Sequence, residues 1–317
     1  MPDNPGREFP PPRQPRLDPP PVSRRALALF AAMAVIWGIP YLLIRIAVSE
    51  VSPPVLVFAR TSIGAVVLVP LAVARVDLRT AFRRFRWVAA FSAAEVAGPW
   101  VLLGWAEQHV TSSLAGLLVA GVPLAGTVIA LLTGRDHHLS RPGLAGLLVG
   151  LVGVAAIAGG DLNGGDAVAI GAIAVVVVGY ALGPWILAHK LAGVPSLGVM
   201  APALTLSALL YLPIAIAQWP VTLPSPAALA SIAILGLVCT ALAFVLFAEL
   251  IAEVGPVRGT VITYINPAVA ATLGVLILGE PFTPAMAAGF ALVIGGSVLA
   301  TRRPAAARAG RVGAAPA

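Results

Sequence analysis

Glu95 stands in an apolar stretch where an acidic side chain is costly. It follows Trp87 by eight residues, which in a helix is about 12 Å at 1.5 Å per residue. If this stretch crosses a membrane, a charge at that depth costs about 2.5 to 3.5 kcal/mol, so the carboxylate should face protein or water. Two interpretations remain open. Glu95 either contacts a solute or carries a proton, or it is the structural partner of Arg60, which enters from the other side.

Two aromatic residues and an arginine form a second candidate site. Trp37, Tyr41 and Arg45 are spaced four residues apart and therefore share one stripe of a helix. Facing inward, this stripe could stack against a planar or cationic molecule, with Arg45 contacting a carboxylate. Alternatively, Arg45 extends to the lipid headgroups and is not part of a site.

Four prolines lie within apolar stretches, at Pro40, Pro123, Pro184 and Pro267. Each removes a backbone donor and leaves one carbonyl without its helical partner. Such carbonyls need another polar group inside a membrane, so we expect the prolines to border a polar cavity and to act as hinges. Polar and aromatic residues near these kinks complete the predicted lining: Trp100, Tyr180, Trp185, Thr263, Tyr264 and Asn266. These side chains could instead link neighbouring helices by hydrogen bonds.

The composition indicates the elements that must position these residues. The chain has 317 residues, is 59% hydrophobic and only 10% charged, and has a mean hydropathy of +0.96. No water-soluble surface can be built from that composition, and apolar runs long enough to cross a bilayer recur. The expected fold class is an all-α membrane protein with ten transmembrane helices, near residues 26–48, 54–74, 87–109, 112–134, 142–159, 166–189, 195–217, 226–250, 257–278 and 284–300.

The basic residues predict how these spans are oriented. If alternate loops are placed on one side, that side collects every Arg and Lys except Arg45 and Arg60, which fall inside spans. This division is typical of a multi-pass protein of the cell (inner or plasma) membrane with both termini in the cytoplasm. The net charge of +7 is therefore a topology signal, and we expect no nucleic-acid partner.

An internal repeat relates the two halves of the chain. Pro267 follows Pro123 by 144 residues, and Gly289 and Gly296 follow Gly146 and Gly153 by 143. We expect a disordered Pro/Arg-rich tail at 1–24, five-helix repeats at 25–160 and 161–301, and a basic tail at 302–317. Because five is an odd number, the repeats must be inverted relative to each other, as in many secondary transporters.

Several of these residues together resemble a known family. Trp37-Gly38, Arg60, the mid-span prolines Pro123 and Pro267, the LILGEP segment ending at Pro281, and the glycine-rich closing spans are similar to the EamA family of the drug/metabolite transporter superfamily. The resemblance implies a ten-helix exporter or exchanger of small metabolites, amino acids or drugs, with a central cavity between the halves. The first repeat departs from it with TGRD, so Asp136 does not inherit the role of Glu280. Both acids lie at span ends, where capping is the expected role.

These observations favour a secondary active transporter that works by alternating access, with Glu95 as the candidate residue for proton coupling. The sequence has no nucleotide-binding loop, and His137-His138 lacks a third metal ligand, so we expect no cofactor, no metal and no enzyme activity. Cys239 is the one cysteine and is expected to be an inert core thiol. The alternative is a membrane-embedded receptor or scaffold, or an enzyme acting on lipid-linked substrates. The expected partners are a small-molecule substrate and the lipid bilayer, and both a monomer and a homodimer remain open.

Overall fold

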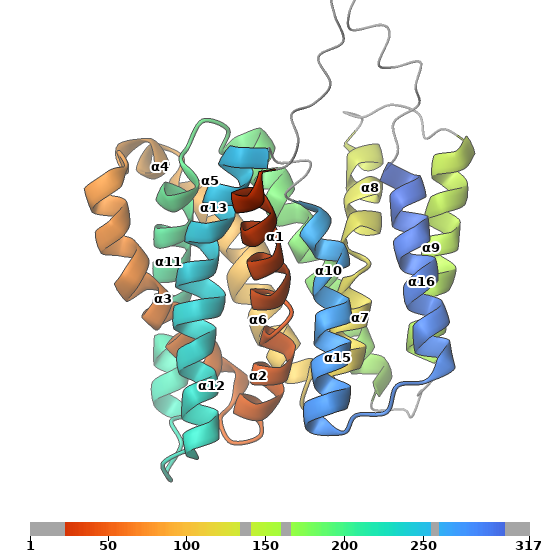
Figure 1. The fold of residues 1–317 in the computed structure, drawn as a ribbon. Coiled ribbons are helices and arrows are strands. Elements are labelled where there is room, and N and C mark those ends of the chain that lie inside the picture. The colour runs from red at the N-terminus through yellow and green to blue at the C-terminus, as the bar shows by residue number, and fades with distance from the viewer. Residues whose placement is uncertain (1–22, 134–140, 160–165, 255–259, 302–317) are drawn as a thin grey trace, which may run out of the picture.

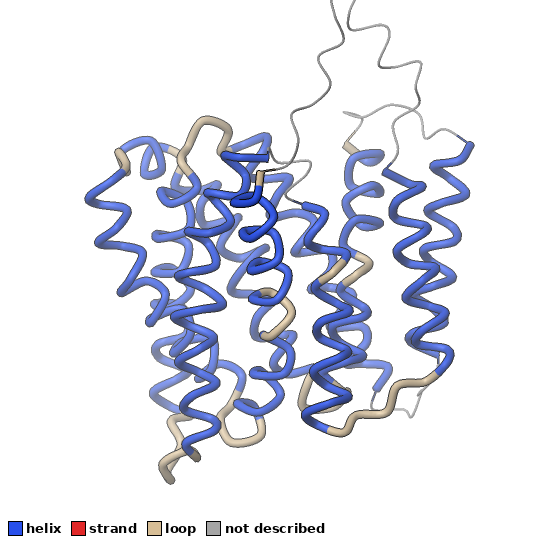
Figure 2. Tube along the Cα trace, viewed as in Figure 1, coloured by secondary structure: helices blue, strands red, loops and turns tan. Residues whose placement is uncertain are grey.

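The computed structural model describes residues 23–133, 141–159, 166–254 and 260–301. Within these residues the chain is helical and contains no strand (Figure 2). The predictions for the two tails, Asp136, His137 and His138 lie outside the described residues.

Nine helices in the described part of the chain are long and apolar enough to cross a membrane. The ninth expected span is represented by a shorter apolar helix at Ile262–Leu278, and residues 255–259 before it are not described. The first repeat contains α1 (Arg24–Ile36), α2 (Pro40–Val48), α3 (Pro53–Arg75), the short α4 (Arg79–Arg83), α5 (Phe85–Phe91), η1 (Ser92–Ala97), α6 (Gly98–Ala106), α7 (Ser112–Val119), α8 (Val122–Leu132) and α9 (Arg141–Gly159). The second contains α10 (Asp166–Lys190), α11 (Ser196–Ala217), α12 (Pro226–Gly236), η2 (Leu237–Leu242), α13 (Ala243–Val254), η3 (Thr260–Tyr264), α15 (Asn266–Leu278) and α16 (Pro284–Thr301).

The helices run side by side between two faces of the molecule (Figure 1). The start of α1 and the end of α16 lie on one face, here named the terminal face. The ends of α2 and α15 and the start of α12 lie on the other, here named the opposite face.

Glycines bring α9 and α16 into backbone contact. A Cβ on Gly146 would lie 2.7 Å from the carbonyl oxygen of Gly296, and one on Gly153 would lie 2.6 Å from that of Gly289. The contact is antiparallel. Gly146 meets Gly296, which is the repeat equivalent of Gly153, and Gly153 meets Gly289, which is the repeat equivalent of Gly146. A two-fold relation between inverted repeats produces this pattern.

This contact gives a prediction about stability. We expect Gly296→Ala to destabilise the protein by about 1 to 3 kcal/mol, because the added methyl group would meet the backbone of Gly146 and Gly150. Its neighbour Gly295 has nothing within 4 Å of an added Cβ, so Gly295→Ala should be neutral or slightly stabilising. Thermal unfolding of both variants in detergent checks the pair, and equal unfolding temperatures would contradict the tight crossing.

Two π-helical segments repeat the symmetry inside the bundle. η1 and η2 begin at Ser92 and Leu237, which are 145 residues apart, and both are six residues long. The same offset places Glu95 of the first repeat on Thr240 of the second. π-helical turns inside α-helices are frequent at functional sites. The level of η1 and η2 in the bundle is therefore a candidate position for a functional site.

Candidate functional site

Arg60 connects the two repeats near the middle of the bundle. It lies on α3, is only 6% exposed, and its Nε donates to Thr240 Oγ1 of η2 at 2.9 Å. Its guanidinium carbon lies 3.5 Å from the centre of the Trp100 ring of α6. A desolvated arginine over a tryptophan face is a strong cation–π arrangement. The protein therefore holds the positive charge of Arg60 at this level against an aromatic ring and not against a carboxylate.

Glu95 does not pair with Arg60 in this structure. The ion pairs between described residues involve Arg25, with Glu249 and Glu253, at the terminal face. Glu95 lies on η1, and its carboxylate packs against Gly183 of α10, where a Cβ would meet Glu95 Oε2 and displace the side chain. The side chain as a whole is partly exposed, but Oε2 is buried and has no hydrogen-bond partner. An unpartnered buried carboxylate oxygen is costly and marks a candidate for solute or proton binding.

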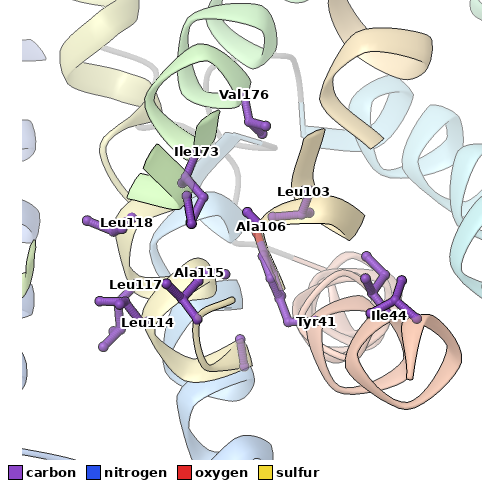
Figure 3. Close-up of a cluster of buried hydrophobic side chains, with 14 of the residues drawn as sticks. Tyr41, Ile44, Leu103, Ala106, Leu114, Ala115, Leu117, Leu118, Ile173 and Val176 are labelled. Carbon is purple, nitrogen blue, oxygen red and sulfur yellow. The ribbon is translucent and has the colours of Figure 1, made fainter. Parts of the chain in front are cut away.

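Two tyrosines complete this group. The Tyr180 side chain on α10 lies within electrostatic reach of both Arg60 and Glu95, and that of Tyr41 on α2 lies within reach of Arg60 and Tyr180. Tyr41 also belongs to the buried apolar cluster beside this level, which includes Leu103 and Ile173 (Figure 3). The structure thus brings together Tyr41, Arg60, Glu95, Trp100 and Tyr180, here named the central cluster.

Two other predicted lining residues, Trp37 and Trp185, have aromatic neighbours of their own. Trp37 packs against Phe244 and Phe247 of α13, with ring centres 6.2 and 4.8 Å apart. Trp185 stacks on His189 at 4.9 Å, near the end of α10. The Trp37 ring therefore packs on α13, and the Trp185 ring lies beside a histidine of its own helix.

Of the predicted residues near Pro267, Asn266 links its helix to another one. The Asn266 side-chain amide faces two backbone carbonyls. With the amide nitrogen turned toward them, it donates to the backbone oxygen of Ile262 at 2.9 Å and to that of Ala34 of α1 at 3.1 Å. Thr263 and Tyr264 belong to the short η3 segment just before it. For Asn266 the contacts match the helix-linking alternative.

Three of the four predicted kink prolines coincide with a break between helices. Pro40 begins α2, Pro123 lies in the first turn of α8, and Pro267 lies in the first turn of α15. Pro184 instead lies inside the continuous α10. Proline is well tolerated in a first helical turn, where its missing N–H has no helical acceptor, so the chain divides these spans at the prolines.

A second polar group, which the sequence did not lead us to expect, lies at the opposite face. Glu280 follows α15 and accepts hydrogen bonds from the backbone N–H groups of Ser112 and Ser113, both at 2.8 Å, and from both serine hydroxyls, at 3.0 and 2.6 Å. Thr111 accepts from the next N–H of the helix, that of Leu114, at 3.2 Å. The first three N–H groups of α7 are therefore satisfied, two of them by a carboxylate from the other repeat.

Glu107 lies beside this cap and completes the opposite-face cluster of Arg45, Glu107, Ser112, Ser113 and Glu280. It is 0% exposed, and both carboxylate oxygens are buried without a hydrogen-bond partner. Arg45 donates to the backbone oxygen of Glu107, so Arg45 points into the protein at this face and not only toward headgroups. Glu107 follows the last residue of α6 by one position, and burial followed by the charge of Glu280 raises its pKa.

Glu50 forms a related but exposed contact at the same face. Its carboxylate accepts from the backbone N–H of Ser225 at 2.6 Å and from the Ser225 hydroxyl, at the start of α12. These bonds, the hydroxyl first, lower the pKa of Glu50. The contact is therefore present at neutral pH and is lost only as the pH falls through that lowered value.

Comparison with known proteins identifies the family. The model of the EamA-like transporter family matches residues 24–159 and 167–302, which is most of the chain in two copies. The protein belongs to the EamA-like transporter family.

Relatives of this EamA-like protein are similar along most of their length. A probable terminal-alkyne amino-acid exporter of Streptantibioticus cattleyicolor is 28% identical over 283 residues, covering 88% of this chain and 94% of the relative. The uncharacterized inner membrane transporter YedA of Escherichia coli K12 is 29% identical over 269 residues, covering 81% of this chain and 85% of YedA. Among the solved structures that match, a protein crystal structure has a TM-score of 0.63 at 24% identity, covering 89% of this chain and 98% of the other. That likeness supports the fold.

Proposed function

We propose that this EamA-like protein is a secondary active transporter that exports or exchanges a small amino-acid-like solute by alternating access. The observation that carries the proposal is the central cluster, which combines an arginine and a carboxylate at one level of an inverted repeat. The amino-acid exporter among the relatives makes an amino acid the first solute to test. Other small metabolites and drugs are further members of the panel.

The chemistry of the central cluster fits a zwitterion. Arg60 makes one side-chain hydrogen bond among the described contacts, to Thr240, and a guanidinium has five N–H donors. The remaining donors suit a solute carboxylate. Glu95, whose Oε2 has no partner, suits the solute ammonium group or a proton that replaces it.

The repeat boundaries and the orientation belong to the same proposal. The repeats occupy residues 25–160 and 161–301, and they rock about the breaks at Pro40, Pro123 and Pro267. The arginine-rich terminal face lies in the cytoplasm, and the opposite face lies outside. Competition between solute and proton for Glu95 then couples export to proton entry.

Proton coupling through Glu95 gives a testable prediction. We expect Glu95→Gln to lose transport driven by a pH gradient while keeping residual counterflow, because the amide cannot exchange a proton. The measurement is uptake of radiolabelled L-amino acids, supplied one at a time, into proteoliposomes with and without a pH gradient. Full pH-driven transport by Glu95→Gln would reject this assignment.

The matched control is Glu249→Gln. Glu249 is an exposed acid at the terminal face whose ion pair with Arg25 is 2.9 Å long. Exposed pairs of this kind contribute little, so the control should transport like the wild type.

A further inference from the structure

The opposite-face cluster contains two carboxylates that cannot be equivalent. Glu280 receives four hydrogen bonds at the positive end of α7, two of them from backbone N–H groups. Glu107 receives none on either oxygen and is fully buried. Two neighbouring carboxylates in one buried site do not both ionise readily, so the proton belongs on Glu107.

The charged and titratable groups around Glu107 come from three other elements. Glu280, after α15, opposes the ionised form of Glu107, whereas Arg45 of α2 favours it. Tyr41 of α2 and Tyr180 of α10 lie within electrostatic reach on the side of the central cluster. Arg45 gives its hydrogen bond to the backbone oxygen of Glu107 and leaves the carboxylate oxygens without a donor. Burial and Glu280 therefore outweigh Arg45.

The same cluster joins the two repeats. Glu280 of the second repeat caps α7 of the first, and α7 and α15 are in tight contact there, since a Cβ on Gly116 would meet Ala270 at 2.6 Å. Glu107 is fully buried beside this contact and lies within electrostatic reach of Glu280, which forms part of it. If α7 and α15 separate, water reaches Glu107 and its proton can leave to the opposite side.

We propose that Glu107 is a proton-binding residue, and that closing the gate between α7 and α15 at the opposite face requires uptake of one proton there. The inference rests on the proposed function, in that the face must open during transport. Closing protonates the carboxylate to the acid, and opening releases the proton to water. Protonated Glu107 stabilises the closed gate at low pH. This stabilisation is lost as the pH rises through the pKa that Glu107 has in the closed state.

The experiment measures the gate directly. Spin labels are placed on cysteines at the exposed positions 109 and 282, one on each repeat, in a Cys239→Ser background, and the distance between them is measured in nanodiscs from pH 5 to 9. For otherwise wild-type protein we expect the ratio of short to long distances to fall at least about fivefold as the pH rises. Glu107→Gln, which mimics the protonated acid, should hold the short distance across the range.

Two further variants make the result decisive. Glu107→Asp keeps a titratable group and should keep a pH response with a shifted midpoint, even if Glu107→Gln folds poorly. Glu50→Gln removes the exposed carboxylate at the same face and should leave the response between pH 5 and 9 unchanged. A pH response in Glu107→Gln equal to the wild type, or no response in the wild type, would overturn the proposal. The measurement uses no solute, so failure to transport any amino acid would reject the proposed function separately.

Discussion

Replacing Arg60 with methionine should lower amino-acid counterflow by about 10- to 100-fold. Methionine keeps most of the apolar stem but removes the donors proposed to bind the solute carboxylate. A hydrogen bond to a charged group contributes about 1.5 to 3 kcal/mol, which corresponds to this range. Counterflow at saturating solute on the inner side isolates binding and the conformational step from proton coupling.

Arg86→Met is the control for Arg60→Met. Arg86 also lies near a tryptophan ring, 5.4 Å from the centre of Trp87, but it is exposed at the terminal face. Its removal should leave counterflow within about twofold, because exposed arginines contribute little to such sites. Arg60→Lys keeps the charge but not the fork of donors, and it should recover only part of the activity. Wild-type counterflow in Arg60→Met would contradict a solute-binding role for Arg60.

Sequence patterns predicted the fold well because a membrane makes the pattern strict. Each span must be long and apolar, and each basic loop must avoid the lipid, so spans and fold class follow from hydropathy and charge. The glycine offset between Gly146 and Gly289 carried the repeat, and the structure confirms the inverted arrangement by pairing each glycine with the equivalent of the other. The hydropathy, charge and repeat spacing of the sequence were therefore enough to predict the spans, the fold class and the inverted repeat.

The site was predictable only where a residue was unusual in itself. Glu95 and Arg60 could be found because charges are rare in spans, and Tyr180 because it lies near a proline. Which way a helix faces depends on its neighbours, so Trp37, which packs on α13, could not be separated from Tyr41 in advance. The hydrogen-bond partner of Arg60 is Thr240, which is the repeat equivalent of Glu95. No sequence spacing predicts that Arg60 and Thr240 meet.

Arg45 and Glu280 were each singled out from the sequence, but the opposite-face cluster as a group was missed because Glu107 looks ordinary in sequence. Glu107 lies at the end of a span, where an acid is usually solvated. The available signal was its context, since an acid four residues before the Thr-Ser-Ser start of the next helix is close to that helix in space. Glu280 was expected to cap a helix, but not that of the other repeat, 168 residues away.

Glu280→Gln should open the gate at the opposite face. The amide keeps one acceptor oxygen but loses the charge, and it replaces the other acceptor with a donor that faces the N–H and O–H groups of Ser112 and Ser113. We expect a loss of at least about 2 kcal/mol from the closed conformation, which lowers the ratio of closed to open by roughly 30-fold. The distance between labels at positions 109 and 282 measures this ratio.

The same variant also tests how the two carboxylates interact. Without the charge of Glu280, the Glu107 carboxyl loses one of the two causes that raise its pKa, so the pH at which the remaining closed fraction opens should fall. Transport should fall with the closed fraction, since a carrier that stays open on one side cannot complete its cycle. Glu50→Gln removes a comparable cap from α12, but that carboxylate is exposed, and the variant should change neither the ratio nor its pH dependence appreciably. If Glu280→Gln and Glu50→Gln behaved alike, the cap on α7 would be one surface contact among several, and the closure of this face would have to depend on the apolar contact between Gly116 and Ala270 alone.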